Sequence, residues 1–386
     1  MNNGGFEEKY NCTNPYLFNA LNWDEIDNNS GCLYCNSCFS SLGGVPVNGF
    51  GFQYPRTGHA YVIADFFCLN CNINSRRTYA RNKLRSTLQS NKVYCVKFYV
   101  NVGNWSTYGI DGVGAYFGDS SLDTITKAHK ILSYLNPQVK NPDNNFITDT
   151  LGWVAVTGTF VATGSEKYMV IGNFKTDAAT NTVIIQTTYP NNKGCTMSID
   201  DVSCIPIDLP AFAGNDTTCI PGSTIYLGRP RDVGIDEACK WYKLPIVITP
   251  TTPALDTAAG IFVSPIVTST YVVMQEICGI IKYDTVVVYQ DAVGLEKLKL
   301  LSEELKIYPT PAQNFIQLQI SNQELLTVFN TVSIFNSLGQ LIRKEDFTVH
   351  ESKSKIKTND LESGVYFLQL NSNINETVRK RFVISR

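Results

Sequence analysis

Short runs of alternating β-branched and aromatic residues, broken by Gly, Asn, Asp and Pro, repeat along most of the chain. Alternation with a period of two places successive side chains on opposite faces of a strand. The runs Val93–Val102 and Cys239–Lys243 are two such predicted strands. Helical periodicity, with apolar residues every three or four positions, is almost missing. The sequence therefore predicts an all-β protein.

The chain has 386 residues, which corresponds to roughly two or three domains at about 150 residues each. A stretch rich in Pro and Gly at residues 205–216 reads as a linker, and a second one of mixed charge follows the strands of the middle segment. We predict a first domain at residues 1–208, a second at 209–292, a linker at 293–304 and a third domain at 305–386.

Charge gives little support for a nucleic-acid or membrane partner. Lys and Arg total 32 against 34 Asp and Glu, so the net charge of −2 offers no electrostatic footprint for a polyanion. No apolar run approaches 18 residues, which argues against a transmembrane helix. The composition predicts a water-soluble chain that forms cores, with 44% hydrophobic residues.

The twelve cysteines are unevenly distributed, with nine in residues 1–208, three in 209–292 and none after them. Their even number and the loop-like surroundings favour disulfides in an exported protein. Thiolates at C-x-x-C spacing can also converge on zinc, although the chain has only three histidines to assist. Zinc is therefore the minority alternative, at Cys32, Cys35, Cys38, Cys68 and Cys71.

The third segment carries an ordered set of motifs. It opens on Leu-Lys-Ile-Tyr-Pro-Thr-Pro-Ala at residues 305–312, continues with Ser-Ile-Phe-Asn-Ser-Leu-Gly-Gln at 333–340 and Leu-Glu-Ser-Gly-Val-Tyr-Phe-Leu at 361–368, and ends on Arg-Lys-Arg-Phe-Val at 379–383. This set resembles the type A C-terminal sorting domain of the type IX secretion system, although Thr310 stands where that family usually has Asn. The residues that carry the sorting signal are then Tyr308, Pro309, Pro311, Gly339, Gly364, Tyr366, Arg379, Lys380 and Arg381.

The resemblance implies that the third domain is an address. It would direct the chain through an outer-membrane translocon, and a sortase-type protease would remove it within or near residues 293–304. The mature protein would then be anchored at the cell surface or secreted. Residues 1–7 lack a basic segment followed by an apolar core, so we expect the exported form to have lost its leader.

The two ends of the first segment also carry motifs that resemble those of known domains. Asn-Asn-Gly-Gly-Phe-Glu-Glu at residues 2–8, Trp23, and Ser-Ile-Asp-Asp-Val at 198–202 are similar to the opening and closing strands of galactose-binding-like jelly rolls, which include carbohydrate-binding modules of families 4, 9 and 22. The resemblance implies a structural calcium ion held by Glu7 and Asp200, with Asp201 as the alternate ligand. A capping or turn role for these carboxylates is the competing interpretation.

Sugars are recognised by flat aromatic faces and a few planar polar groups. The first segment holds three of the four tryptophans of the chain. Any single aromatic residue here is more often a core residue than a ligand contact. The candidates for ligand binding are Trp23, Tyr54, Tyr61 and Trp105, with Arg56 and His59.

The middle segment resembles an immunoglobulin-like or polycystic-kidney-type module, on Cys219, the run Cys-Lys-Trp at residues 239–241 and Thr-Tyr-Val at 270–272. The fold class is therefore all-β, a jelly-roll sandwich followed by two smaller immunoglobulin-like sandwiches. By this resemblance Cys239 pairs with Cys278, and Cys219 reaches back to Cys204. A passive spacer is the simplest role for such a module.

These features favour a secreted or surface-anchored, adhesin-like protein that binds glycan. A structural or adhesive matrix protein that binds other proteins is the second hypothesis. The sequence lacks Gly-x-Ser-x-Gly, His-Glu-x-x-His and Walker-type motifs, so we predict that it is not an enzyme. A two-carboxylate glycosidase is the enzymatic alternative, with a pair drawn from Asp65, Asp111, Asp119, Asp149 and Glu166.

Overall fold

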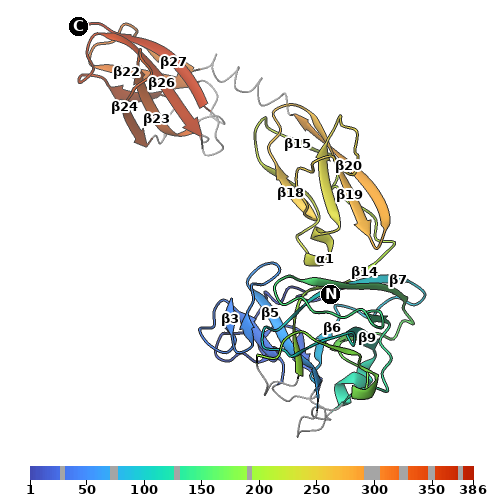
Figure 1. Ribbon diagram of the computed structural model, residues 1–386. Helices are drawn as coiled ribbons and strands as arrows, with labels where there is room; N and C mark the ends of the chain where they lie inside the picture. The colour runs from blue at the N-terminus through green and yellow to red at the C-terminus, as the bar shows by residue number, and fades with distance from the viewer. Residues whose placement is uncertain are drawn as a thin grey trace. The chain divides into compact units, whose positions relative to one another are not determined.

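The structure is a computed structural model that describes residues 1–26, 31–69, 77–125, 131–188, 194–290, 305–320, 329–346, 353–372 and 377–386 (Figure 1). Strands dominate the described chain, and its one α-helix is the single turn α1 (Val233–Asp236). The predicted all-β class is confirmed. No helix among these residues is both long enough and apolar enough to cross a bilayer.

The first sandwich packs two five-stranded antiparallel sheets against each other. One sheet has the order β1 (Trp23–Glu25), β6 (Ala80–Lys83), β12 (Tyr168–Gly172), β9 (Gly114–Gly118), β10 (Val139–Lys140). The other has the order β11 (Val154–Val161), β7 (Val93–Val102), β14 (Gly194–Pro206), β5 (Ala60–Cys68), β2 (Leu33–Asn36). Two short hairpin-like pairs lie outside these sheets, β3 (Val47–Asn48) with β4 (Gly51–Phe52) and β8 (Tyr108–Ile110) with β13 (Thr182–Ile184).

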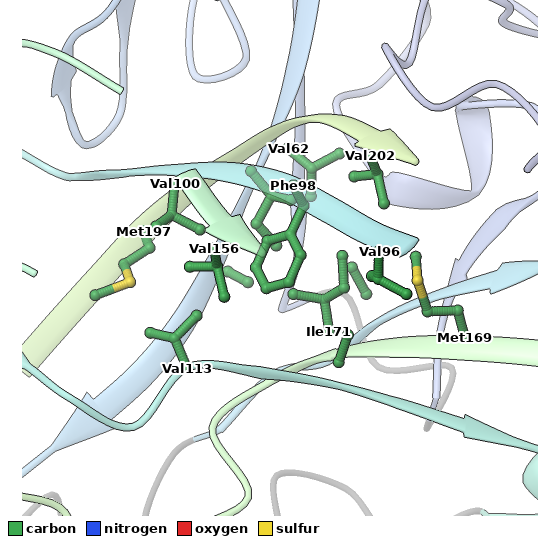
Figure 2. Close-up of a cluster of buried hydrophobic side chains, with 14 of the residues drawn as sticks. Val62, Val96, Phe98, Val100, Val113, Val156, Met169, Ile171, Met197 and Val202 are labelled. Carbon is green, nitrogen blue, oxygen red and sulfur yellow. The ribbon is translucent and has the colours of Figure 1, made fainter. Parts of the chain in front are cut away.

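The core of this sandwich follows from strand alternation. Val96, Phe98 and Val100 are two residues apart on β7 and fully buried. Figure 2 shows them in one cluster with Met169 and Ile171, which come from the opposite sheet. Burying each such side chain contributes roughly 1.5–3 kcal/mol, so this layer holds the two sheets together.

The second sandwich joins a four-stranded sheet to a two-stranded one. The sheets have the orders β15 (Thr217–Cys219), β20 (Ile280–Gln290), β19 (Ser269–Ile277), β17 (Cys239–Lys243) and β16 (Ile225–Gly228), β18 (Gly260–Val263). Trp241 on β17 is fully buried, and its Nε1 donates a hydrogen bond to the carbonyl oxygen of Ala258 at 2.8 Å. The indole therefore occupies the centre of this core with its polar atom satisfied.

The third sandwich has sheets of the orders β21 (Leu305–Tyr308), β22 (Phe315–Ile320), β25 (Lys353–Lys357) and β24 (Leu341–Asp346), β23 (Phe329–Asn336), β26 (Gly364–Ser372), β27 (Thr377–Ile384). Its core includes the fully buried Phe382, whose ring stacks on Tyr366 at 5.7 Å. Gly339, with φ of 79°, closes the turn between β23 and β24, where Asn336 Oδ1 accepts hydrogen bonds from the N–H groups of Leu338 and Gln340. The motif at residues 333–340 therefore contains a tight turn.

The chain divides into two compact units. The first comprises residues 1–215, 226–263 and 269–287, and the second comprises 216–225, 264–268 and 288–386. This division does not test the domain boundaries predicted at residues 208, 292 and 304, which stay predictions.

Two disulfides are defined among the described residues, Cys12–Cys38 and Cys95–Cys278, and Cys68 is also disulfide-bonded. The predicted Cys239–Cys278 and Cys204–Cys219 pairs are therefore wrong. Cys239 lies opposite Gln275 in the β17–β19 ladder, whereas Cys278 sits in the turn three residues farther along, about 10 Å at 3.3 Å per residue. That separation exceeds the reach of a disulfide. Cys204, Cys219 and Cys239 are buried thiols.

These thiols are expected to be almost inert in the folded protein. Burial raises the pKa of Cys204 to about 12 and that of Cys239 to about 11. The thiolate is the reactive form, so alkylation by iodoacetamide at pH 8 should be at least about 100-fold slower in the native chain than in guanidinium. Peptide mass spectrometry measures both rates. Fast native labelling of Cys239 would contradict the burial.

Candidate functional site

The three predicted calcium ligands bind the segment formed by residues 56–60. Glu7 Oε1 accepts hydrogen bonds from the backbone N–H groups of His59 at 2.7 Å and Ala60 at 3.0 Å. Asp200 Oδ2 accepts one from the backbone N–H of Arg56 at 2.8 Å. The Arg56 guanidinium donates to Asp201 Oδ2 at 2.5 Å. Backbone N–H groups of residues 56–60 and the Arg56 guanidinium thus already bind carboxylate oxygens that a calcium ion would need.

Arg56 is held on further sides. Its guanidinium lies 3.5 Å from the centre of the Tyr99 ring and forms an ion pair with Glu237. Tyr99 donates its hydroxyl hydrogen to Glu237 Oε2 at 2.9 Å. Burial alone lowers the pKa of Arg56, but the hydrogen bond to Asp201 and the charge of Glu237 raise it above its usual value. Burial, and then the Asp201 charge, raise the pKa of Asp200 well above its usual value.

The metal assignments are corrected by this geometry. No group of three or more His, Cys, Asp or Glu that could hold a metal occurs among the described residues. For calcium, Arg56 supplies the positive charge between the carboxylates of Asp201 and Glu237. For zinc, Cys38 and Cys68 are consumed in disulfides, and Cys71 lies outside the described residues.

The predicted aromatic residues do not form one surface. Tyr61, on β5, is fully buried, donates its hydroxyl hydrogen to the carbonyl oxygen of Gln53 at 3.1 Å, and is therefore a core residue. Tyr54 is 61% exposed and contacts Phe52 edge-on, with ring centres 5.3 Å apart. Trp105, in the loop after β7, is 39% exposed. His59 is also exposed.

Trp23 lies on the other sheet of the first sandwich and lines a cavity there. The residue is 2% exposed, its ring packs on Phe6 with centres 4.5 Å apart, and its Nε1 donates to the carbonyl oxygen of Asn3 at 2.8 Å. It forms part of the wall of a cavity of about 360 Å³ on the sheet that contains β1, β6 and β12. We call this cavity the Trp23 pocket; its lining residues are Tyr10, Phe18, Asn22, Trp23, Asp24, Lys83, Asp123 and Tyr168.

Two exposed aromatic side chains border the Trp23 pocket, Tyr10 at 68% and Phe18 at 56% exposure. The segment that carries them is fixed by the backbone hydrogen bond from Tyr10 N to Asn19 O at 2.9 Å and by the buried Leu17 in the 3-10 turn η1 (Leu17–Asn19). The Cys12–Cys38 disulfide ties the same segment to the rest of the fold. Sequence reasoning missed both aromatic residues; the only signal was their position in a segment stapled by Cys12.

The polar side of the Trp23 pocket is a fixed charge network. Arg81, 6% exposed on β6, donates two hydrogen bonds to the Asp24 carboxylate, both at 2.7 Å, and lies 3.5 Å from Asp123. Tyr168 donates to Asp123 Oδ2 at 2.6 Å, which raises the pKa of the tyrosine. Lys83 is exposed at the end of β6. Both carboxylates therefore keep defined positions and have lone pairs left for a ligand.

The carboxyl groups considered for glycosidase chemistry have other tasks. Asp111, Asp119, Asp149 and Glu166 each accept hydrogen bonds from backbone N–H groups. Burial raises the pKa of Asp111 and Glu166, but the hydrogen bonds outweigh it. Hydrogen bonds also hold the pKa of Asp119 and Asp149 below the usual value. Asp65 lies on β5.

The basic run of the third sandwich lies on β27. Arg379 donates to Gln369 Oε1 at 2.5 Å and lies over the Phe335 ring at 5.1 Å, while Arg381 is exposed. Residues 306–385 match the family model described as the secretion system C-terminal sorting domain. These residues form such a sorting domain. The sorting domain marks the chain for export by the type IX secretion system, to the cell surface or into the medium.

Further comparisons leave the ligand open. A search of the curated proteins found no match. The xylan-binding domain CBM22-1 of Xyn10C from Paenibacillus barcinonensis is 11% identical over 53% of this chain and 91% of its own, with a TM-score of 0.28. The K1 cleaved adhesin domain of Lys-gingipain from Porphyromonas gingivalis W83 is 14% identical over 52% and 95%, with a TM-score of 0.27. Scores this low assign no ligand to this chain.

Proposed function

We propose that this chain is an exported, non-enzymatic binding protein whose first sandwich holds a glycan in the Trp23 pocket. The observation that carries the proposal is the pairing of two exposed aromatic rings, Tyr10 and Phe18, with the fixed carboxylates of Asp24 and Asp123 at one cavity. Aromatic faces cover the C–H surface of a sugar, and oriented carboxylates accept hydrogen bonds from its hydroxyls.

The charges of the Trp23 pocket favour an uncharged sugar. Asp24 and Asp123 are balanced by Arg81 and Lys83, so the local net charge is zero. Because the network is already assembled without ligand, little side-chain entropy is lost on binding. Polar groups held in this way give specificity for the orientation of hydroxyls rather than for a net charge.

Delivery is the task of the sorting domain. In this proposal the translocon recognises the folded third sandwich, and a sortase then cleaves between residues 292 and 305. The part of the chain before the cleavage site, which contains the Trp23 pocket, remains as the mature binding protein at the surface or outside the cell. Asp111, Asp119, Asp149 and Glu166 have lowered pKa values, so none of these four candidates has the raised pKa that the general acid of a glycosidase needs.

A second candidate function, adhesion to another protein, is favoured by a different surface. Val47, Phe52 and Tyr54 are 65%, 52% and 61% exposed, and Val47 and Phe52 are cross-strand neighbours on β3 and β4. We call these three residues the hairpin surface. Contiguous exposed apolar groups of this kind are typical of protein contacts.

The two functions are separated by retention of the full chain on a panel of immobilised polysaccharides. We expect Phe18→Ala to weaken retention about 2- to 13-fold, corresponding to the roughly 0.5–1.5 kcal/mol that one aromatic contact contributes beyond its buried area. Phe52→Ala, which removes an equally exposed ring from the hairpin surface, is the matched control and should leave retention unchanged. Two results would count against the glycan proposal. One is a loss of retention in Phe52→Ala but not in Phe18→Ala, and the other is no retention of the wild-type chain on any polysaccharide.

A further inference from the structure

A second cavity lies at the other end of the sheet that carries the Trp23 pocket. It has a volume of about 290 Å³ and is formed where β9, β10 and the end of β12 meet. We call it the Lys140 pocket, after Lys140 at the end of β10; the residues used below are Asp111, Ser133, Asn136, Lys140, Asn141 and Lys175. The Lys140 and Trp23 pockets share no lining residue.

A buried carboxylate fixes one side of the Lys140 pocket. Asp111 is fully buried, and its oxygens accept hydrogen bonds from the backbone N–H groups of Asn144 at 2.9 Å and Asn181 at 3.1 Å, and from Asn181 Nδ2 at 2.8 Å. It also pairs with Lys175 Nζ at 3.0 Å. A buried charge with this many donors stays ionised and holds its partner in place. Asp111 is therefore a positioning residue for Lys175.

The charges in and beside the Lys140 pocket are equal in number, but they are not all paired. Lys175, with 23% of its side chain exposed, pairs with Asp111 and also reaches Asp143 at 2.8 Å on the solvent side. Two carboxylates therefore share one ammonium group. Lys140 is exposed, and its ammonium forms no ion pair with the residues that the structure describes. The ammonium of Lys140 is the one left to meet a ligand.

Neutral polar groups complete the Lys140 pocket. Ser133 and Asn136 are exposed at its rim, and Asn141 is buried with its amide nitrogen donating to the carbonyl oxygens of Asp111 at 3.1 Å and Asn145 at 2.6 Å. Ligand sites for drug-sized molecules begin at about 300 Å³, so a cavity of 290 Å³ suits a single small ring. The hydroxyl and amide at the rim can exchange hydrogen bonds with ligand hydroxyls.

We propose that the Lys140 pocket binds a hydroxylated carboxylic acid, with a uronic acid unit as the ligand class. The carboxylate of the ligand lies against the Lys140 ammonium, and its hydroxyls contact Ser133 and Asn136. One ammonium group without an ion-pair partner among the described residues matches a singly charged carboxylate better than a phosphate, which carries more charge and is usually bound by several N–H donors. This site is independent of the glycan proposed for the Trp23 pocket and differs from it in requiring a negative charge.

The experiment is an isothermal titration calorimetry measurement at low salt, in which D-glucuronate is titrated into the full chain. D-glucose and inorganic phosphate are titrated into the same chain in parallel. Glucuronate should bind saturably and at least about 10-fold more tightly than either of the other two, and its affinity should fall as salt screens the charge pair. Absence of glucuronate binding, or equal affinity for phosphate, would overturn the proposal.

Variants locate the binding. Lys140→Gln removes one exposed charge and should weaken glucuronate binding at least about 10-fold, whereas Lys140→Arg retains most of it. Lys240→Gln makes the same change at an exposed lysine of β17 that lines neither pocket, and it should leave glucuronate affinity unaltered. Equal losses in Lys140→Gln and Lys240→Gln would sink the assignment to this pocket. Failure here leaves polysaccharide retention through Phe18 untouched, so the two proposals fail separately.

Discussion

An Arg56→Met variant is expected to lose about 3 kcal/mol of unfolding free energy, because it strands a buried carboxylate without its counter-charge. The Asp201 side chain is 1% exposed, and Arg56 is its ion-pair partner. Met keeps an aliphatic stem of similar length, so the loss reports mainly on the removed guanidinium, which pairs with Asp201 and lies over the Tyr99 ring. Guanidinium unfolding measures the difference.

A matched control and a second variant sharpen this result. Arg231 forms a more exposed pair with Asp236, with 64% of the arginine side chain exposed, so Arg231→Met should cost less than about 1 kcal/mol. Adding Asp201→Asn to Arg56→Met removes the stranded charge and should recover a large part of the lost stability. A loss below about 1 kcal/mol for Arg56→Met, or recovery on adding calcium, would contradict the arginine-centred account.

A Phe382→Ala variant is expected to abolish export while leaving the first unit folded. Phe382 is fully buried in the core of the sorting domain and stacks on Tyr366. Truncating a buried Phe costs about 3–5 kcal/mol, which is comparable to the whole stability of a domain of this size. The variant therefore distinguishes recognition of a folded sorting domain from recognition of its linear sequence.

The readout is the fraction of protein at the surface and in the medium of a host that has the type IX system. Leu338→Ala is the matched control, because Leu338 is 82% exposed in the β23–β24 turn and its loss should leave export near the wild-type level. All four tryptophans lie in the first unit, so unchanged tryptophan fluorescence shows that Phe382→Ala has left that unit intact. Normal export of Phe382→Ala would refute recognition of the fold.

Local patterning was enough to predict some of the strands. Val93–Val102 and Cys239–Lys243 have the predicted bounds, since alternation in sequence and alternation of burial have the same physical cause. The sorting domain was accessible for a different reason, because its motifs occur in a fixed order along residues 305–386 and match a family model over residues 306–385.

Contacts between distant residues were not predictable in the same way. Asp200 and Asp201 were assigned to a calcium ion, but their observed partner Arg56 is more than 140 residues away, and nothing in the sequence links it to them. The Cys95–Cys278 bond spans 183 residues and joins β7 of the first predicted domain to the turn between β19 and β20 in the second. Such pairings are set by the assembled fold rather than by spacing.

The sequence also did not predict which aromatic side chains are exposed. Tyr54 and Tyr61 are seven residues apart in one aromatic-rich stretch, yet one is 61% exposed and the other fully buried. Tyr10 and Phe18 border the Trp23 pocket because the Cys12–Cys38 disulfide and the η1 turn hold their segment in place. A single sequence shows that an aromatic residue is present, but it does not show whether its side chain is exposed or buried.

The most direct test of the central claim is hydroxyl-radical footprinting of the full chain with and without the polysaccharide that retains it best. Oxidation of each exposed aromatic ring, read by mass spectrometry, reports whether ligand covers it. We expect protection of Tyr10 and Phe18, with Phe52 and Tyr54 on the hairpin surface oxidised as before. Protection of Phe52 and Tyr54, with Tyr10 and Phe18 unchanged, would contradict the claim that the Trp23 pocket holds the glycan.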